Sequence, residues 1–265
     1  MGKVYLVGAG PGDPELLTVR ALRLLQSADV VLHDALVSAE VLAVIETSNV
    51  IDIGKRCGTK LLSQAEINSL LVAYAREHEI VVRLKGGDPS IFGRAGEEID
   101  ALSEQGIAFE VVPGVTSAIA GAAAAGISLT DRRHAASVVF LTAHRGPGAE
   151  SIAWDKLAAS HSTLAVYMPG SDYQQLAEQL CGAGLDEQTA CAVISHAGRN
   201  TQQLRWVTLA TLPLLQPLPA PSLLIVGECA RPLHKPETLL SNRPSIEEGI
   251  LQFDPHAIES TYRSQ

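Results

Sequence analysis

Short apolar runs alternate with amphipathic segments along the N-terminal part of the chain. Runs that are apolar at nearly every position are typical of strands buried on both faces of a parallel sheet. Such runs lie at Lys3–Val7, Asp29–His33, Ile80–Leu84 and Ile107–Val112. Between them, apolar residues recur at helical spacing, for example at Ile67, Leu70, Leu71 and Tyr74. The alternation predicts an α/β domain with a doubly wound sheet over residues 1–115.

A second α/β pattern follows in the C-terminal half. Strands are predicted near Ser137–Thr142, Thr163–Met168, Thr189–Ser195 and Leu223–Val226, with an antiparallel strand at Gln203–Thr208 and helices near 151–159 and 172–183. We therefore expect a second domain over residues 116–235, with a linker at about 126–136. Residues 236–265 are polar and punctuated by proline, which predicts a poorly ordered tail.

Residues 79–98 contain the most informative turn of the chain. Gly86, Gly87 and Pro89 end the apolar run at Leu84, and helix-forming residues resume near Arg94. Open α/β sheets place ligands at the carboxyl ends of their strands, and adjacent glycines let a ligand lie against bare main chain. The turn therefore predicts a ligand site, although a tight strand-to-helix connection without a ligand stays open as the alternative.

Three further strand ends carry candidate chemistry. The loop from Gly8 to Pro14 resembles a dinucleotide fingerprint but has Asp13 where that motif needs glycine, which disfavours an NAD-dependent oxidoreductase. Asp34 follows a strand end and is a candidate for chemistry or for a simple turn, and neighbouring His33 should point to the opposite face. Thr116 or Ser117 could cap the next helix or help that helix start bind a polar ligand atom.

Composition narrows the classes of function. The net charge of −9 argues against a nucleic-acid partner, and 46% hydrophobic with 18% charged residues is typical of a globular protein. The four cysteines form no CxxC pair and have no histidine at ligand spacing, so we expect no metal site and no disulfide framework. No signal peptide and no apolar run long enough to span a membrane is apparent, which predicts a soluble, cytoplasmic protein without a membrane partner.

Six segments of the chain, in this order, resemble the tetrapyrrole methylases, and within them the members that methylate uroporphyrinogen III at carbon. They are GAGPGDPELLT (8–18), HDALV (33–37), GKR (54–56), VRLKGGDPSIFGRAGEE (82–98), VVPGVTSA (111–118) and GISLTDR (126–132). The later segments LTAHRG, AVYMPG and SLLIVGE also fit, so the resemblance covers about residues 1–230. The long block at 82–98 is its most specific part.

The resemblance implies two α/β domains with the active site in the cleft between them, usually in a homodimer. It also implies S-adenosylmethionine as methyl donor, S-adenosylhomocysteine as by-product and uroporphyrinogen III as acceptor. Methylation at C2 and C7 would give precorrin-2 by way of precorrin-1, on the path to sirohaem and cobalamin.

Matched position by position, the resemblance also implies site residues. The proton acceptor would be Asp34 and the proton donor Lys55. The cofactor-binding residues would be Pro11, Gly86, Gly87, Asp88, Ile91, Thr116, Ser117, Met168 and Ala197. The chain departs from the family pattern at His33 (usually Tyr), Ser90 (Phe), Ala95 (Gly), Ser128 (Pro), Asp131 (His) and Ala197 (Gly). None of these departures removes a matched charged group.

The chemistry of such a reaction agrees with these residue types. A porphyrinogen pyrrole carbon is already nucleophilic and a sulfonium methyl group is already electrophilic, so the protein must align them and assist loss of a ring proton. The acceptor carries many carboxylates, which requires a cationic cleft even in an acidic protein. We expect substrate contacts from Arg56, Lys60, Arg94, Arg132, Arg133 and Arg145.

Three alternatives remain open on the sequence. They are a methylase of the same fold that acts on another precorrin or on a protein side chain, an NAD-dependent oxidoreductase, and a non-catalytic module that only binds the cofactor.

Overall fold

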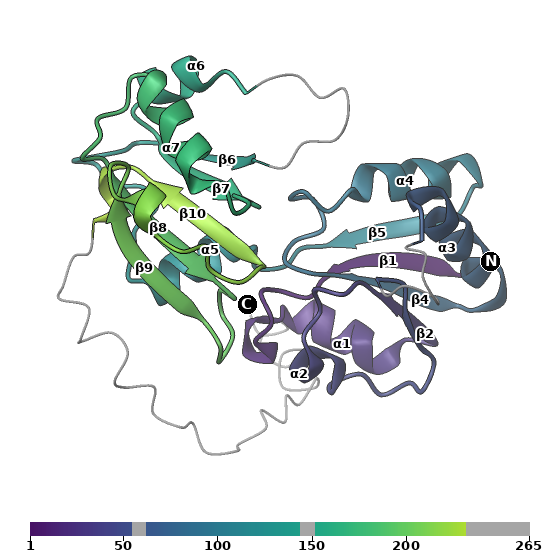
Figure 1. Cartoon of the computed structure of the whole chain (residues 1–265). Helices are drawn as coiled ribbons and strands as arrows, with labels where there is room; N and C mark the ends of the chain where they lie inside the picture. The colour runs from purple at the N-terminus through teal and green to yellow at the C-terminus, as the bar shows by residue number, and fades with distance from the viewer. Residues whose placement is uncertain (55–61, 144–151, 232–265) are drawn as a thin grey trace, which may run out of the picture. The chain divides into compact units, whose positions relative to one another are not determined.

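The computed structural model describes residues 1–54, 62–143 and 152–231. Its N-terminal half contains a five-stranded sheet in the order β3-β2-β4-β1-β5, in which every pairing is parallel (Figure 1). The strands are β1 (Lys3–Gly8), β2 (Val30–His33), β3 (Val50–Asp52), β4 (Ile80–Lys85) and β5 (Ala108–Val112). The parallel sheet predicted from the apolar runs is confirmed.

Helices cover both faces of this sheet. They are α1 (Val19–Ser27), α2 (Ala39–Leu42), α3 (Gln64–Glu77) and α4 (Ala95–Glu104). Leu25 of α1 and Val41 of α2 are buried with Val31 and Leu84 on one face, whereas Leu71 of α3 is buried with other strand residues on the opposite face. The doubly wound arrangement therefore follows from apolar side chains on both faces of each strand.

Local hydrogen bonds set the helix starts. The spacing of Ser63 and Glu66 predicts a capping box, and the two residues form one at the start of α3. The sequence predicts a single helix from about Glu15 to Gln26, and this is wrong at its start, because Pro14–Leu16 forms a short 3₁₀ turn and α1 begins only at Val19. The Thr18 side chain accepts a hydrogen bond from the Ala21 amide at 3.1 Å, which makes Thr18 the N-cap of α1.

The topology of this sheet creates a crevice at the carboxyl ends of two neighbouring strands. Strand β1 lies between β4 and β5, yet the helices that follow β1 and β4 pack on opposite faces of the sheet. The loops after β1 and β4 therefore diverge, which is the point where open α/β sheets bind ligands.

The C-terminal half contains a second five-stranded sheet in the order β6-β7-β10-β8-β9. Its strands are β6 (Val138–Thr142), β7 (Thr163–Tyr167), β8 (Ala190–Ser195), β9 (Gln203–Thr208) and β10 (Ser222–Val226). Strands β6 and β7 are parallel, whereas β10 is antiparallel to both of its neighbours. Strand β9 is antiparallel to β8, as predicted. The second sheet is thus mixed.

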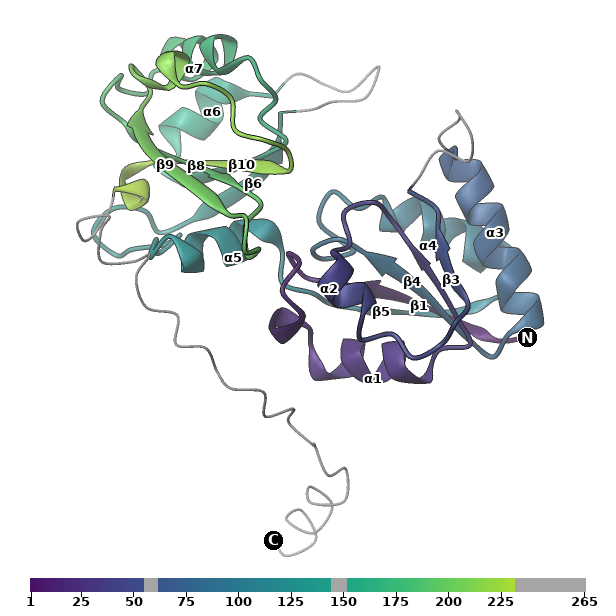
Figure 2. The same ribbon diagram turned by 60° about the horizontal axis from the view of Figure 1, so that its bottom comes forward.

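Helix α5 (Ser117–Ala124) packs on one face of this second sheet, and α6 (Trp154–Ala159) and α7 (Tyr173–Gly182) pack on the other (Figure 2). Small residues let α5 approach closely, since a Cβ atom at Gly121 would lie only 3.1 Å from Cδ1 of Ile194. Residues 1–231 of the described chain fall within one contact unit that contains both sheets. The boundaries expected at 115/116 and at the 126–136 linker stay predictions, and the expected tail at 236–265 lies outside the described residues.

Among the described residues, no helix combines the length and the apolar character that a membrane crossing requires.

Candidate active site

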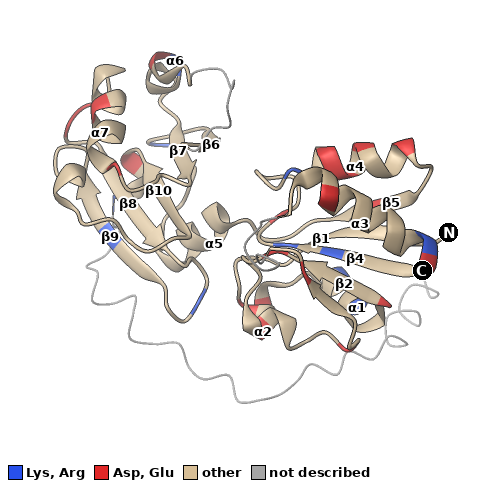
Figure 3. Ribbon diagram, turned by 45° about the vertical axis from the view of Figure 1, so that its right-hand side comes forward, with Lys and Arg blue, Asp and Glu red and all other residues tan. Residues whose placement is uncertain are grey.

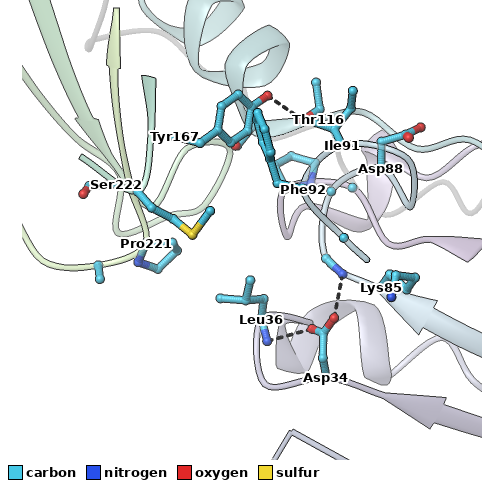
Figure 4. A pocket seen from close by; sticks show the side chains of 18 of the residues that line it. Asp34, Leu36, Lys85, Asp88, Ile91, Phe92, Thr116, Tyr167, Pro221 and Ser222 are labelled. Atoms are coloured by element: carbon cyan, nitrogen blue, oxygen red, sulfur yellow. Dashed lines mark hydrogen bonds between the residues drawn. The ribbon is translucent and has the colours of Figure 1, made fainter. Parts of the chain in front are cut away.

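A cavity of about 810 Å³ opens at the crevice between the loops that follow β1 and β4 (Figure 4). The first sheet contributes the ends of β1, β2 and β4, and helix α5 contributes its start. The second sheet contributes the residues after β7 and the segment that leads into β10. The volume lies within the range of about 300–1,000 Å³ that is usual for small-molecule sites.

The two glycine loops are joined to each other at the base of this cavity. The amide of Gly10 donates to the carbonyl of Gly87 at 3.1 Å, and the amide of Gly87 donates to the carbonyl of Gly10 at 2.8 Å. Both residues have positive φ angles, 68° for Gly10 and 70° for Gly87, which L side chains rarely adopt. Gly114 packs so closely that a Cβ atom there would overlap the Gly87 carbonyl oxygen. The glycines thus permit three loops to meet main chain against main chain.

Asp88 ties two of these loops together. Its Oδ2 accepts a hydrogen bond from the Gly114 amide at 2.9 Å, and its Oδ1 accepts from the Ser90 amide at 2.8 Å and from the Ser90 hydroxyl. Asp88 also lines the cavity. Its carboxylate therefore holds the turn in shape while it places negative charge beside the cavity.

Asp34 is fixed at the rim of the cavity by main-chain donors. Its Oδ1 accepts from the Leu36 amide at 3.0 Å and its Oδ2 accepts from the Gly86 amide at 3.3 Å (Figure 4). A 28% exposed side chain leaves the carboxylate accessible from the cavity. His33 is buried and its Nδ1 lies 3.0 Å from the Asp34 main-chain carbonyl, so its ring does not contact the carboxylate. His33 and Asp34 thus make separate hydrogen bonds, and the catalytic role of Asp34 stays a prediction.

A buried group of charges, Arg83, Lys85 and Glu98, lies behind Asp34. Glu98 is fully buried, and it accepts hydrogen bonds from Arg83 Nε at 3.0 Å and from Lys85 Nζ at 2.9 Å. Arg83 Nη2 also lies 4.0 Å from Oδ2 of Asp34. Burial, and then the nearby Arg83 guanidinium, lower the pKa of Lys85 from its usual range. Figure 3 colours basic positions in β4 blue and acidic positions along α4 red, and these are the two elements that carry the group.

Sequence reasoning missed this buried group. Arg83 interrupts the apolar run at Ile80–Leu84, and the sequence predicts no site role for Arg83, Lys85 or Glu98. The available signal was the alternation of a strand, which places residues 83 and 85 on the same face, where a buried cation requires an acidic partner.

The opposite wall of the cavity is aromatic. The rings of Phe92 and Tyr167 lie 4.9 Å apart, and the Tyr167 hydroxyl lies 2.7 Å from Oγ1 of Thr116 (Figure 4). Thr116 occupies the N-cap position of α5 but makes no side-chain capping hydrogen bond, because its hydroxyl pairs with Tyr167 instead. Burial raises the pKa of Tyr167 above its usual value of 10.0, so this phenol stays protonated as a hydrogen-bond donor. Phe92, Arg94 and Met168 all have positive φ angles of 49–55°, a strained backbone of the kind that clusters at functional sites.

Most of the described site predictions fall on this one cavity. The residues that line it are Pro11, Asp34, Gly86, Gly87, Asp88, Ile91, Arg94, Thr116, Ser117 and Met168. It is also lined by residues without a sequence prediction, among them Arg83, Lys85, Phe92, Tyr167 and Arg199. Tyr167 and Arg199 come from the second sheet, far away in sequence, and no local pattern marks them.

Three predicted residues lie away from the lining. Ala197 is buried and packs near Gly121, and neither Arg132 nor Arg133 lines the cavity. Arg133 is exposed and pairs with Asp131 at 2.7 Å, which holds the pKa of that carboxyl below its usual range. The roles predicted for Ala197, Arg132 and Arg133 stay predictions. Lys55, Arg56, Lys60 and Arg145 lie outside the described residues.

The cavity suits a cationic cofactor that bears an adenosine group. It offers bare main chain at Gly86 and Gly87, and a side chain at Gly86 would meet Leu36 because its Cβ would lie 2.8 Å from the Leu36 Cβ. The carboxylates of Asp34 and Asp88 favour a positive sulfonium, and the aromatic wall suits an apolar ring. Within the described ranges, no three histidine, cysteine, aspartate or glutamate side chains are placed to bind a metal ion.

Comparison with known proteins identifies the family of the chain. The family model for the Tetrapyrrole (Corrin/Porphyrin) Methylases matches residues 3–213. The chain is 51% identical over 229 residues to Siroheme synthase 1 of Pectobacterium atrosepticum, a match that covers 86% of this chain and 48% of that protein. The chain thus spans about half the length of the curated relatives it matches.

Solved structures give the same picture. The uroporphyrin-III C-methyltransferase of Thermus thermophilus, solved with S-adenosylhomocysteine, is 38% identical with a TM-score of 0.77, over 89% of this chain and 96% of that one. A cobalt-precorrin-4 methyltransferase is 30% identical with a TM-score of 0.76, over 87% of this chain and 96% of that one. The chain therefore belongs to the tetrapyrrole methylase family.

Proposed function

We propose that this chain is an S-adenosylmethionine-dependent C-methyltransferase that converts uroporphyrinogen III to precorrin-2 by way of precorrin-1, with methylation at C2 and C7. The observation that carries the proposal is Asp34, which two main-chain amides hold beside the Gly86–Gly87 turn at the rim of a cavity of about 810 Å³. The similarity to the Thermus thermophilus methyltransferase supports it over almost the whole length of that enzyme.

The turn at Gly86 and Gly87 would bind the donor. S-adenosylmethionine, when bound, supplies an electrophilic methyl group. Main-chain groups of the turn and the side chains of Thr116 and Ser117 provide polar contacts, while Asp88 places negative charge beside them. The fixed hydrogen bonds between Gly10 and Gly87 keep this surface in one geometry, so that alignment contributes to rate. Alignment of two reactants can supply about 7–11 kcal/mol of a barrier.

Asp34 would accept the ring proton. The pyrrole carbon that receives the methyl group already carries a side chain, so it becomes quaternary and holds no hydrogen, and the methylated ring is left as a cation. Loss of a proton from a neighbouring position of the macrocycle, such as the adjacent bridging carbon, restores neutrality. The carboxylate is accessible at the cavity rim, and the Leu36 and Gly86 amides hold its orientation. A positioned proton acceptor of this kind typically contributes about 10²–10⁴-fold in rate.

A methylase for a different precorrin is the second candidate. The similarity to a cobalt-precorrin-4 methyltransferase, at 30% identity, favours this reading less than the 38% identity favours uroporphyrinogen III. The same assay separates the two.

The test is methyl transfer by the purified chain. We would incubate it with S-adenosylmethionine labelled in the methyl group and with uroporphyrinogen III generated anaerobically, and identify products by mass spectrometry. We expect a singly methylated product followed by a doubly methylated one that carries both labels. Absence of labelled products, with methylation of another precorrin in a parallel reaction, would replace the proposed substrate.

The family resemblance further implies Lys55 as proton donor, a homodimer and a product destined for sirohaem or cobalamin. We also expect a cytoplasmic location. Light scattering of the purified chain would test the dimer directly.

A further inference from the structure

Arg199 comes from the turn that follows β8 and reaches the loops of the first sheet. Its Nε donates to the Pro11 carbonyl at 3.1 Å and its Nη2 donates to the Leu36 carbonyl at 2.5 Å. Gly12 makes room for this side chain, because a Cβ atom at Gly12 would lie 2.7 Å from Nε of Arg199. The guanidinium therefore has a defined position at the cavity, which it lines.

Within residues 1–54, 62–143 and 152–231, no acidic side chain pairs with the Arg199 guanidinium. The three other described cations that line the cavity are each paired with a glutamate, Arg83 and Lys85 with Glu98 and Arg94 with Glu97. Among the described residues, the Arg199 side chain donates hydrogen bonds only to the two neutral carbonyls of Pro11 and Leu36. A guanidinium has five N–H donors, so donors remain for a ligand.

Arg199 and Asp34 are both hydrogen-bonded to Leu36. Leu36 accepts from Arg199 through its carbonyl and donates to Asp34 Oδ1 at 3.0 Å through its amide. One residue thus separates the Arg199 guanidinium from the carboxylate that would take the ring proton. A group bound at Arg199 would lie at the same rim as Asp34.

We propose that Arg199 binds a carboxylate of the acceptor and thereby sets which pyrrole ring faces Asp34. This inference rests on the proposed function and adds a substrate-binding residue to it. Arginine is suited to the role because its planar fork matches a carboxylate, and a hydrogen bond between two charged groups is stronger than one between neutral groups. The acetate and propionate groups of a porphyrinogen provide the required anions.

The experiment compares Arg199→Gln and Arg199→Lys with the wild type. Arg205→Gln is the matched control, because Arg205 is an exposed arginine on β9 that does not line the cavity. Binding of uroporphyrin III, the oxidised and unreactive form, is followed by the anisotropy of its own fluorescence. Coproporphyrin III, in which methyl groups replace the acetates, serves as the less acidic probe. Calorimetry gives the affinity for S-adenosylhomocysteine, and turnover gives KM and kcat with uroporphyrinogen III.

We expect Arg199→Gln to weaken uroporphyrin binding and raise the acceptor KM about tenfold, which corresponds to about 1.4 kcal/mol. Affinity for S-adenosylhomocysteine should stay within about twofold, Arg199→Lys should recover part of the loss, and Arg205→Gln should match the wild type. Unchanged uroporphyrin binding in Arg199→Gln would overturn the inference. An equal loss of cofactor and uroporphyrin affinity in both Arg199 variants would also overturn it, since Arg199 would then only hold the loops.

These results are distinct from a failure of the proposed function. A wild-type chain that does not methylate uroporphyrinogen III defeats that function, whereas the uroporphyrin anisotropy does not depend on turnover.

Discussion

Replacement of Glu98 by glutamine should destabilise the fold strongly, because it leaves two buried cations without their counter-charge. Arg83 and Lys85 have side chains only 5% and 4% exposed, and both donate to the fully buried Glu98 at 3.0 and 2.9 Å. Glutamine keeps the size of the side chain and can still accept hydrogen bonds. The change therefore removes charge while it nearly preserves shape.

The size of the expected loss of stability in Glu98→Gln follows from the burial of these side chains. Removal of one partner from a buried ion pair typically costs about 3–5 kcal/mol, because the remaining charge has lost both water and its partner. Asp34, 4.0 Å from Arg83, offsets part of this cost, so we expect about 3 kcal/mol for Glu98→Gln. This is a large share of the about 5–15 kcal/mol by which folded domains are typically stable.

Glu97→Gln is the matched control. Both glutamates lie in the first turn of α4 and share its favourable helix dipole, but Glu97 pairs with Arg94 on the surface, where the side chains are 50% and 59% exposed. An exposed pair contributes only about 0–1 kcal/mol. We would measure the free energy of unfolding of each variant by urea denaturation at neutral pH. Equal losses for Glu97→Gln and Glu98→Gln would refute the reasoning from burial.

Three other outcomes follow from the same geometry. Asp34→Ala should leave S-adenosylhomocysteine binding within about twofold while turnover falls by about 10² or more, and unchanged turnover would remove Asp34 from the reaction. Gly87→Val should abolish cofactor binding, because a β-branched residue strains φ at 70° and disturbs the pairing with Gly10, and a normal dissociation constant by calorimetry would contradict this. Burial lowers the pKa of Lys85 below 10.5. Between the lowered pKa and 10.5, the folded state therefore binds fewer protons than the unfolded chain. The contribution of Lys85 to the free energy of unfolding thus rises with pH in this range. The stability of the wild type relative to Lys85→Met should therefore increase as the pH rises toward 10.5, and a constant or falling difference would be inconsistent with that shift.

The elements of this protein were largely predictable because their signals are local. The strands of the first sheet are apolar on both faces, and the Ser63–Glu66 capping box marks the start of α3 directly. The predicted start of α1 was too early because Glu15 has a high helix propensity. The helix starts only after Thr18, which supplies the N-cap three residues later. Propensity was outweighed there by one side-chain hydrogen bond.

The site was predictable only in part because its walls join distant segments. The Gly86–Gly87 turn and Asp34 are marked by their positions at strand ends, and both lie at the cavity. Arg199 reaches Pro11 across 188 positions in sequence, and the Tyr167 hydroxyl meets Thr116 across 51. Such contacts depend on tertiary packing, which periodicity and turn chemistry do not encode.

The most direct test of the account is a crystal structure of the chain with S-adenosylhomocysteine bound. The account predicts the ligand in the cavity beside Asp34, with its atoms in contact with the main chain of Gly86, Gly87 and Asp88 and with Thr116 and Ser117. A ligand bound elsewhere, with residues 85–89 in contact only with other protein atoms, would contradict it.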